Sequence, residues 1–273
     1  MPGIAARSLG FACLGVLGWA LVGSLLAPST PAGDLPVGTP VHRFASPGDY
    51  PEGLTWDGKW LWVNNFTNGT LYAVNPADGQ IVSQHTGIDM PARPEGLTWD
   101  GETLWSSDWV SGTITQMRQT ATGMEVVAAY QKPADAGKPV GLTWDGTYLW
   151  LACFGFELNT KSELFQIDPE GFTVVKRLQL PIWWIGDLAW DGQRLWSVDW
   201  LFGIGFAIDP ATGDTSTTYE TPGPNPVGMA WDGTHLWLGD TSADSLWALD
   251  VSAGQPTPVR AVSWTEIKNR YRD

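Results

Sequence analysis

Apolar and polar positions alternate along this chain in short runs, and one such run returns five times. Each copy sets a short apolar segment on either side of a Trp-Asp-Gly tripeptide. Short segments of this kind around an Asp-Gly pair predict two antiparallel strands joined by a tight turn. The copies are PEGLTWDGKWLW at 51–62, PEGLTWDGETLW at 94–105, PVGLTWDGTYLW at 139–150, IGDLAWDGQRLW at 185–196 and PVGMAWDGTHLW at 226–237.

Two further strands complete each unit. GTLYAVN at 69–75 is a third strand, NPADG at 75–79 is the turn after it, and QIVSQH at 80–85 is an outer strand. Strand-rich units that repeat every 40–50 residues are typical of β-propeller blades, which bury their apolar faces only by stacking in a ring. The chain is therefore predicted to be all-β, a five-bladed β-propeller of four-stranded antiparallel blades over 41–264. Either VHRFAS at 41–46 or TPVRAVSW at 257–264 closes the ring.

The chain before the repeats has a different pattern. Leu9–Ala27 carries no charge, and its nineteen residues would span about 28 Å as a helix, close to the thickness of a bilayer core. We expect residues 1–27 to form an N-terminal transmembrane helix that anchors the chain, with a cleaved signal peptide as the alternative. Residues 28–40 read as a Pro-rich linker and 265–273 as a C-terminal tail. The propeller is then expected on the periplasmic or extracellular side.

Composition narrows the functional classes. The net charge of −14, from 15 basic and 29 acidic residues, argues against a nucleic-acid partner. Cys13 and Cys153 lie in different regions, and three scattered His residues show no metal-ligand spacing, so we expect no disulfide, metal or cofactor. Ten of the 18 Trp residues recur at two repeated positions. A residue type found at one site in every blade indicates packing between blades.

Candidate functional residues lie where the copies differ. One set of positions precedes the first strand of each blade, as Glu52 and Glu95 do. The second set lies fourteen residues later, just after the second strand. Both sets should lie on one face of the ring, which we call the mouth face. Its acidic and aromatic side chains are the candidate ligand-binding set: Glu52, Asn65, Phe66, Asp108, Trp109, Phe154, Asp187, Asp199, Trp200 and Asp240. Such a mouth suits a cationic group set against Trp faces. Oxygen ligands for Ca²⁺ and simply solvated carboxylates are the alternatives.

Blade four adds an apolar feature. Two of its loops, on the mouth face, carry apolar side chains where loops are normally polar: Ile182, Trp183, Trp184, Ile185, Leu201 and Phe202. A contiguous exposed apolar patch usually marks a contact with a partner or a membrane. We therefore expect a partner-binding surface here, unless one loop simply covers the other.

The blade pattern resembles the five-bladed glutaminyl-peptide cyclotransferases of plants and bacteria. The specific part is blade two, where PEGLTW supplies Glu95 and SSDW supplies Trp109, fourteen residues later. The resemblance implies that Glu95 is a catalytic proton shuttle while the substrate α-amine attacks its own side-chain amide, and that Trp109 and Trp200 line the pocket. Other positions of the family pattern differ: Glu52 replaces a Gln, Val140 a Trp and Gly186 an Asn, and a Lys expected near Asp240 has no counterpart.

Three functions follow as expectations. The first is a membrane-anchored, exported propeller that acts as a non-catalytic binding or scaffold subunit, with another membrane or periplasmic protein as partner. The second is a cyclotransferase-like enzyme that uses Glu95. The third is a Ca²⁺-dependent hydrolase that uses Glu52, Asn65, Asp199 and Asp240.

Overall fold

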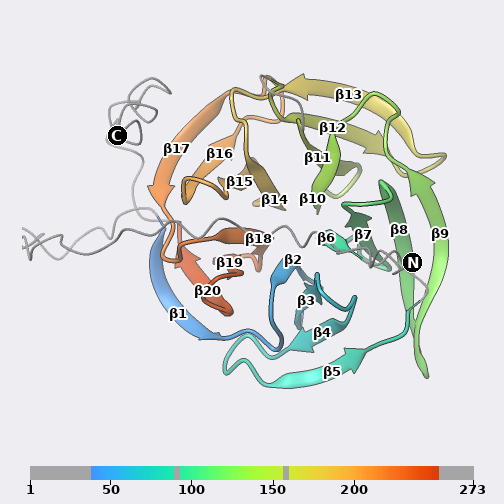
Figure 1. Cartoon of the computed structure of the whole chain (residues 1–273), viewed down its shortest axis with the longest axis vertical. Helices are drawn as coiled ribbons and strands as arrows, with labels where there is room; N and C mark the ends of the chain where they lie inside the picture. Colours follow the sequence, from blue (N-terminus) through green and yellow to red (C-terminus); the bar gives the residue numbers. More distant parts are fainter. Residues whose placement is uncertain (1–37, 89–92, 156–159, 252–273) are drawn as a thin grey trace, which may run out of the picture. The chain divides into compact units, whose positions relative to one another are not determined.

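The described part of the chain is a ring of five sheets. The computed structural model describes residues 38–88, 93–155 and 160–251, which form five four-stranded antiparallel sheets around a central axis (Figure 1). In each sheet the segment before Trp-Asp-Gly is the innermost strand. The predicted all-β, five-bladed propeller is therefore confirmed.

Each of the first four blades uses four consecutive strands. Blade one contains β2 (Pro51–Trp56), β3 (Leu61–Asn65), β4 (Leu71–Val74) and β5 (Ile81–His85). Blade two contains β6 (Pro94–Trp99), β7 (Leu104–Asp108), β8 (Thr113–Thr120) and β9 (Gly123–Gln131). Blade three contains β10 (Lys138–Trp144), β11 (Leu149–Phe154), β12 (Glu163–Asp168) and β13 (Thr173–Gln179). Blade four contains β14 (Ile185–Trp190), β15 (Leu195–Asp199), β16 (Ile204–Ile208) and β17 (Thr215–Glu220).

The fifth blade closes the ring with a strand from the other end of the sequence. It contains β18 (Pro226–Trp231), β19 (Leu236–Asp240), β20 (Ser245–Asp250) and β1 (Thr39–Ala45). The outer strand β1 pairs antiparallel with β20, from Thr39 opposite Asp250 to Ala45 opposite Ser245 (Figure 1). Of the two closing segments that the sequence offered, the one at 41–46 fills this place.

The terminal predictions fall outside the described residues. Leu9–Ala27, most of the linker, the segment at 257–264 and the tail at 265–273 all lie there. Within the described ranges, no helix has the length and apolar character needed to cross a membrane.

Five apolar clusters, one at each junction between neighbouring blades, form the core. Each holds a second-strand Trp from one blade and the Trp of Trp-Asp-Gly from the next. Between blades one and two, for example, Trp62 is 2% exposed and Trp99 packs beside it. The Trp62 indole donates to Asp57 at 2.7 Å, and Asp57 also accepts from the backbone of its own turn. The same bonds recur in every blade, so the structural interpretation of the repeated Trp and Asp residues is confirmed.

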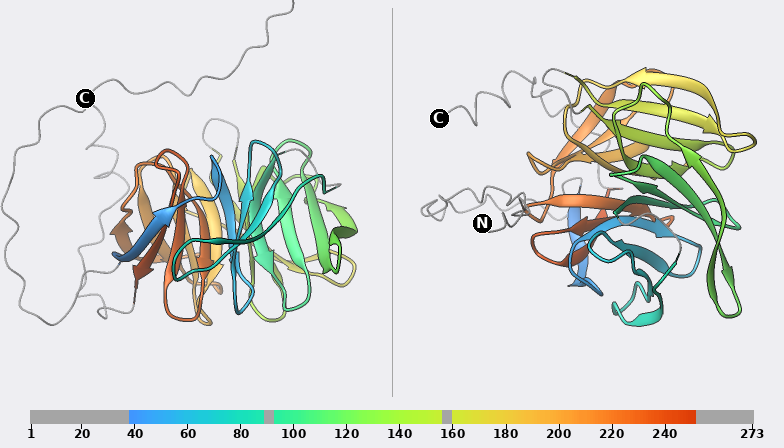
Figure 2. Two further views of the ribbon diagram at one scale, coloured as in Figure 1. Left: turned by 90° about the horizontal axis from the view of Figure 1, so that it is seen from below. Right: turned by 45° about the vertical axis from the view of Figure 1, so that its right-hand side comes forward.

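The innermost strands are irregular at their mouth-face ends. The left view of Figure 2 shows the ring from the side, with strand connections along two opposite faces. In blade one Pro51 pairs with Asn65 and Leu54 with Val63, so Glu52 and Gly53 together oppose one residue of β3. This is a β-bulge, a device that re-aims side chains beside functional sites. All five blades carry an irregularity at this position, and it decides what points into the mouth.

Candidate functional site

Asp187 lies at the centre of the ring, where the other blades have glycine. In those blades the third residue of the repeat is Gly53, Gly96, Gly141 or Gly228. These glycines let the inner strands approach closely, since a Cβ on Gly96 would lie 2.6 Å from the Leu142 nitrogen. Blade four has a carboxylate at this position instead, with 2% of the residue exposed.

Backbone groups from three other blades hold the Asp187 carboxylate. The amide of Leu142 donates to Oδ1 at 2.9 Å, and the amides of Leu54 and Met229 donate to Oδ2 at 3.2 and 3.1 Å. Burial raises the pKa of Asp187 well above its usual range, and these amide donors oppose that shift. Asp187 therefore joins blades one, three, four and five at the axis.

Glu52 and Glu95 form the acidic part of the mouth. Glu52 is 8% exposed, and its Oε2 atom has no hydrogen-bond partner among the described residues. Burial raises the pKa of Glu52 to about 8. Burial also raises the pKa of Glu95 well above its usual range, and the negative charges of Glu52, Asp187 and Asp108 add to that shift, while Arg93 opposes it. The pKa values of both glutamates are thus raised, a property that marks candidate functional groups in clefts.

The two glutamates are positioned by polar residues that the sequence analysis missed. Buried Asn64 accepts from the Gly53 amide at 2.7 Å and donates to the Glu95 carbonyl at 2.9 Å. Buried Ser107 accepts from the Gly96 amide at 3.0 Å. Asn64 therefore holds the backbone next to Glu52 and at Glu95, and Ser107 holds the backbone next to Glu95. The available signal was a polar residue inside an otherwise apolar second strand, as in LWVNN at 61–65.

Four predicted ligand residues hold the mouth-face turns. Each has a side-chain oxygen that accepts the backbone amides two and three residues further on; they are Asn65, Asp108, Asp199 and Asp240. All four are buried. Burial raises the pKa of Asp199 to about 7, against the backbone amides of Phe202, Leu201 and Trp184.

Aromatic side chains line blades two to four of the mouth. Trp109 stacks on Phe154 with ring centroids 5.8 Å apart, Phe154 stacks on Trp184 at 5.1 Å, and Trp184 meets Trp200 edge-on at 5.3 Å. We call these four residues the aromatic band. The structure thus brings three predicted mouth aromatics together, with Trp184 inserted between two of them.

Blades one and five do not contribute to the aromatic band at their equivalent positions. In blade one the Arg93 guanidinium lies over the Phe66 ring, 5.0 Å from its centroid. In blade five the corresponding position is Thr241, which is buried and bonded to Asn225. The aromatic surface therefore covers one side of the mouth only.

The apolar patch predicted on blade four requires a correction. Ile182 is 6% exposed and Ile185 is fully buried, and both belong to the core between blades three and four. Trp184 packs against the same core and joins the aromatic band. Leu201, by contrast, is 49% exposed. The packing between blades three and four buries Ile182 and Ile185, so they are not part of an exposed surface.

No group of three or more His, Cys, Asp or Glu side chains within the described ranges is arranged to hold a metal ion.

Known structures share this fold. A glutaminyl cyclase from Myxococcus xanthus aligns with a TM-score of 0.65 and 18% identity, over 79% of this chain and 97% of that chain. A structure of a nidogen/laminin complex aligns with a TM-score of 0.53 and 17% identity, over 76% of this chain and 78% of that chain. The predicted resemblance to glutaminyl cyclases is confirmed for the fold. No protein-family model and no curated protein matches the chain.

Proposed function

We propose that the axial mouth binds the protonated amine of a small ligand, such as the N-terminal residue of a peptide, between Glu52 and Glu95. The observation that carries this proposal is the buried Oε2 of Glu52, which has no partner among the described residues. A buried polar atom without a hydrogen bond costs about 1–3 kcal/mol. An ammonium group supplies the missing donor.

The charge balance of the mouth supports the same ligand chemistry. Three carboxyl groups raise the pKa of Glu95, and Arg93 is the single cation that opposes them. Arg93 is itself exposed and stacked on Phe66. A ligand ammonium would lower the pKa of both glutamates, because an opposite charge nearby favours the ionised form.

The aromatic band supplies the second half of the proposed site. It lies on blades two to four, the blades that also include Glu95 of blade two and Asp187 of blade four. Trp faces attract cations and also bury apolar groups. The proposed ligand therefore carries an apolar group next to its amine.

Binding of phenylalanyl-leucinamide tests this proposal. We expect the full-length protein in mild detergent to bind this dipeptide amide saturably, because it has a free amine and no carboxylate. The N-acetylated dipeptide should not bind, and Glu52→Gln should weaken binding about tenfold, the size expected for one charge-assisted hydrogen bond. Equal binding of the free and acetylated dipeptides by calorimetry would contradict the proposal.

A second candidate is cyclisation of an N-terminal glutamine. Glu95, with its raised pKa, stands fourteen residues before Trp109, and a glutaminyl cyclase shares the fold. In that reaction the neutral α-amine attacks the side-chain amide carbon, the new C–N bond closes the ring, and ammonia leaves. Glu95 would take the proton from the amine and pass it to the departing nitrogen.

Ammonia release distinguishes the enzyme from a binding module. If the second candidate holds, a peptide with N-terminal Gln should release ammonia with the wild type, and Glu95→Gln should lower the rate about 100-fold or more, the usual effect of losing a general acid–base. The same peptide with N-terminal Asn is the control substrate. Ammonia release no faster than in buffer would leave amine binding as the sole function of the mouth.

We also propose, on the sequence alone, that residues 9–27 anchor the chain in a membrane and that the propeller lies on the periplasmic or extracellular side of that membrane. Because Ile182 and Ile185 belong to the core, the proposed surface for a protein partner is reduced to Leu201, Trp183 and Phe202. Retention of the chain in alkali-washed membranes would support the anchor, and its release would contradict it.

A further inference from the structure

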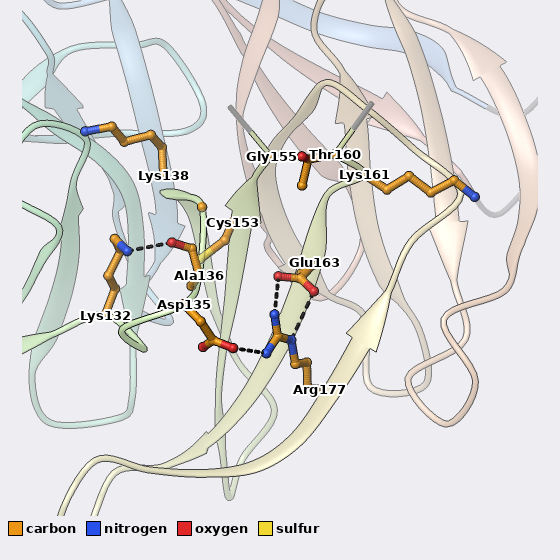
Figure 3. Close-up of a pocket in the computed structure, with 11 residues that line it drawn as sticks. Lys132, Asp135, Ala136, Lys138, Cys153, Gly155, Thr160, Lys161, Glu163 and Arg177 are labelled. Carbon is orange, nitrogen blue, oxygen red and sulfur yellow. Dashed lines mark hydrogen bonds and ion pairs between the residues drawn. The ribbon is translucent and has the colours of Figure 1, made fainter. Parts of the chain in front are cut away.

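A second cavity lies in blade three, outside the aromatic band. It measures about 570 Å³, within the range of small-molecule sites. Its walls come from the segment between β9 and β10, the start of β10, the end of β11, the residues just before and at the start of β12, and Arg177 of β13 (Figure 3). The glutamates of the axial mouth do not line it.

The cavity opens where blade three departs from the repeat. In the other blades an Asn or Asp at the end of the second strand holds a short turn, as Asp108 does for residues 109–112. Blade three has Cys153 at this position, and its connection runs over 155–162. A thiol is a weak hydrogen-bond acceptor, so Cys153 is poorly suited to hold a turn in the way that Asp108 does. Cys153 instead lines the cavity, 1% exposed.

Positive charge gathers around this cavity although the chain as a whole is strongly acidic. Its walls carry Lys132, Lys138, Lys161 and Arg177 against two acids, Asp135 and Glu163. Among the described residues, four of the 15 basic residues of the chain therefore line one cavity against two acids.

The two acids are already committed to Arg177. Its Nε and Nη2 donate to the two carboxylate oxygens of Glu163 at 3.0 and 2.9 Å, and Nη1 pairs with Asp135 (Figure 3). Arg177 also lies over the Phe165 ring, with its centroid at 5.2 Å. On this side of the cavity the negative charges of Glu163 and Asp135 are therefore paired with Arg177.

The three lysines form no ion pair with any carboxylate in the described ranges. The Lys132 ammonium points inward and donates to the Ala136 carbonyl at 2.6 Å (Figure 3). Lys138 and Lys161 stand on either side of the opening and extend away from it (Figure 3), and the Lys138 ammonium donates to the Val110 carbonyl at 3.4 Å. Each has a flexible four-carbon stem that can turn toward a bound group.

We propose that this cavity is an oxyanion site, which takes the phosphate or carboxylate group of a small ligand between Lys132, Lys138 and Lys161. Ammonium groups recognise such oxyanions by charge-assisted hydrogen bonds. The site is independent of the amine proposed at the axial mouth.

Titration with two probes tests the site and separates its ligand sources. Inorganic phosphate and citrate are titrated separately into the full-length protein at low ionic strength, with calorimetry as the readout. At least one probe should bind saturably, and the tighter one identifies the group. The Lys138→Gln/Lys161→Gln double variant should bind that probe about 100-fold more weakly, about tenfold for each lost ammonium contact.

Lys59→Gln is the matched control, since it removes the same charge from an exposed turn of blade one and should leave the affinity unchanged. An unchanged melting temperature of the double variant shows that its weaker binding is not a folding defect. Failure of both probes to saturate, or equal affinity of the wild type and the double variant, would overturn the proposal.

Discussion

Replacing Asp187 with alanine is expected to lower the free energy of unfolding by about 3 kcal/mol or more. The reason is that the backbone amides of Leu54, Leu142 and Met229 all donate to this one side chain, and each buried donor left without a partner costs about 1–3 kcal/mol. A loss of this size is a large share of the stability of a typical domain. Chemical denaturation with tryptophan fluorescence measures it.

Two further variants separate the carboxylate from other effects. Asp187→Gly gives blade four the residue of the other four blades, and we expect it to be as unstable as the alanine variant, because the amides lose their acceptor in both. Asp214→Asn changes an exposed acid of the same blade and should cost less than about 0.5 kcal/mol. A wild-type stability for Asp187→Gly would mean that the carboxylate does not hold the ring together.

The propeller is expected to lose stability as the pH rises from about 5 to 8. Burial raises the pKa of Glu52 to about 8 in the folded protein, whereas an unfolded Glu ionises near pH 4.3. Its contribution is thus fully present below the unfolded pKa and is lost as the pH rises through the folded pKa. Glu95, Asp187 and Asp199, whose pKa values are also raised, act in the same direction.

Glu52→Gln isolates the contribution of Glu52 to this pH dependence. At pH 8 the variant should exceed the wild type in free energy of unfolding by on the order of 3 kcal/mol, and at pH 5 the two should be nearly equal. Glu125→Gln, on the exposed outer strand β9, should follow the wild type at every pH. Parallel curves for the wild type and Glu52→Gln would show that Glu52 titrates like an exposed acid.

Much of the fold could be predicted from the sequence, because the constraints that build a blade are local. Asp57 illustrates this: within a few residues it forms its turn and accepts the Trp62 indole, so the motif alone fixes the hairpin. The constant spacing of fourteen residues between the start of the first strand and the end of the second was also informative, since it predicted that Trp109, Phe154 and Trp200 lie on one face. The identity of the closing strand was not predictable, because both terminal segments have the composition of an outer strand.

The inner arrangement of the site required the structure. Asp187 resembled one more acid of the mouth, and only the geometry shows that it takes the place of a glycine and accepts backbone amides from three other blades. Ile182 and Ile185 were both predicted in an exposed loop, yet Ile185 begins β14 and packing against blade three buries both residues. Asn64 was overlooked because its role depends on a contact with Glu95 of the next blade, a relation between repeats that no local pattern encodes.

Titration of the side-chain carboxyl groups by NMR tests the proposed amine site most directly. The protein is labelled with ¹³C at the glutamate side chains, and the Glu52 signal is assigned with Glu52→Gln. We predict a Glu52 midpoint near the pKa of about 8, a clear fall of that midpoint when phenylalanyl-leucinamide is added, and no change with its N-acetylated form. A Glu52 midpoint near 4.3, the value of an exposed Glu, that neither compound moves would contradict the account.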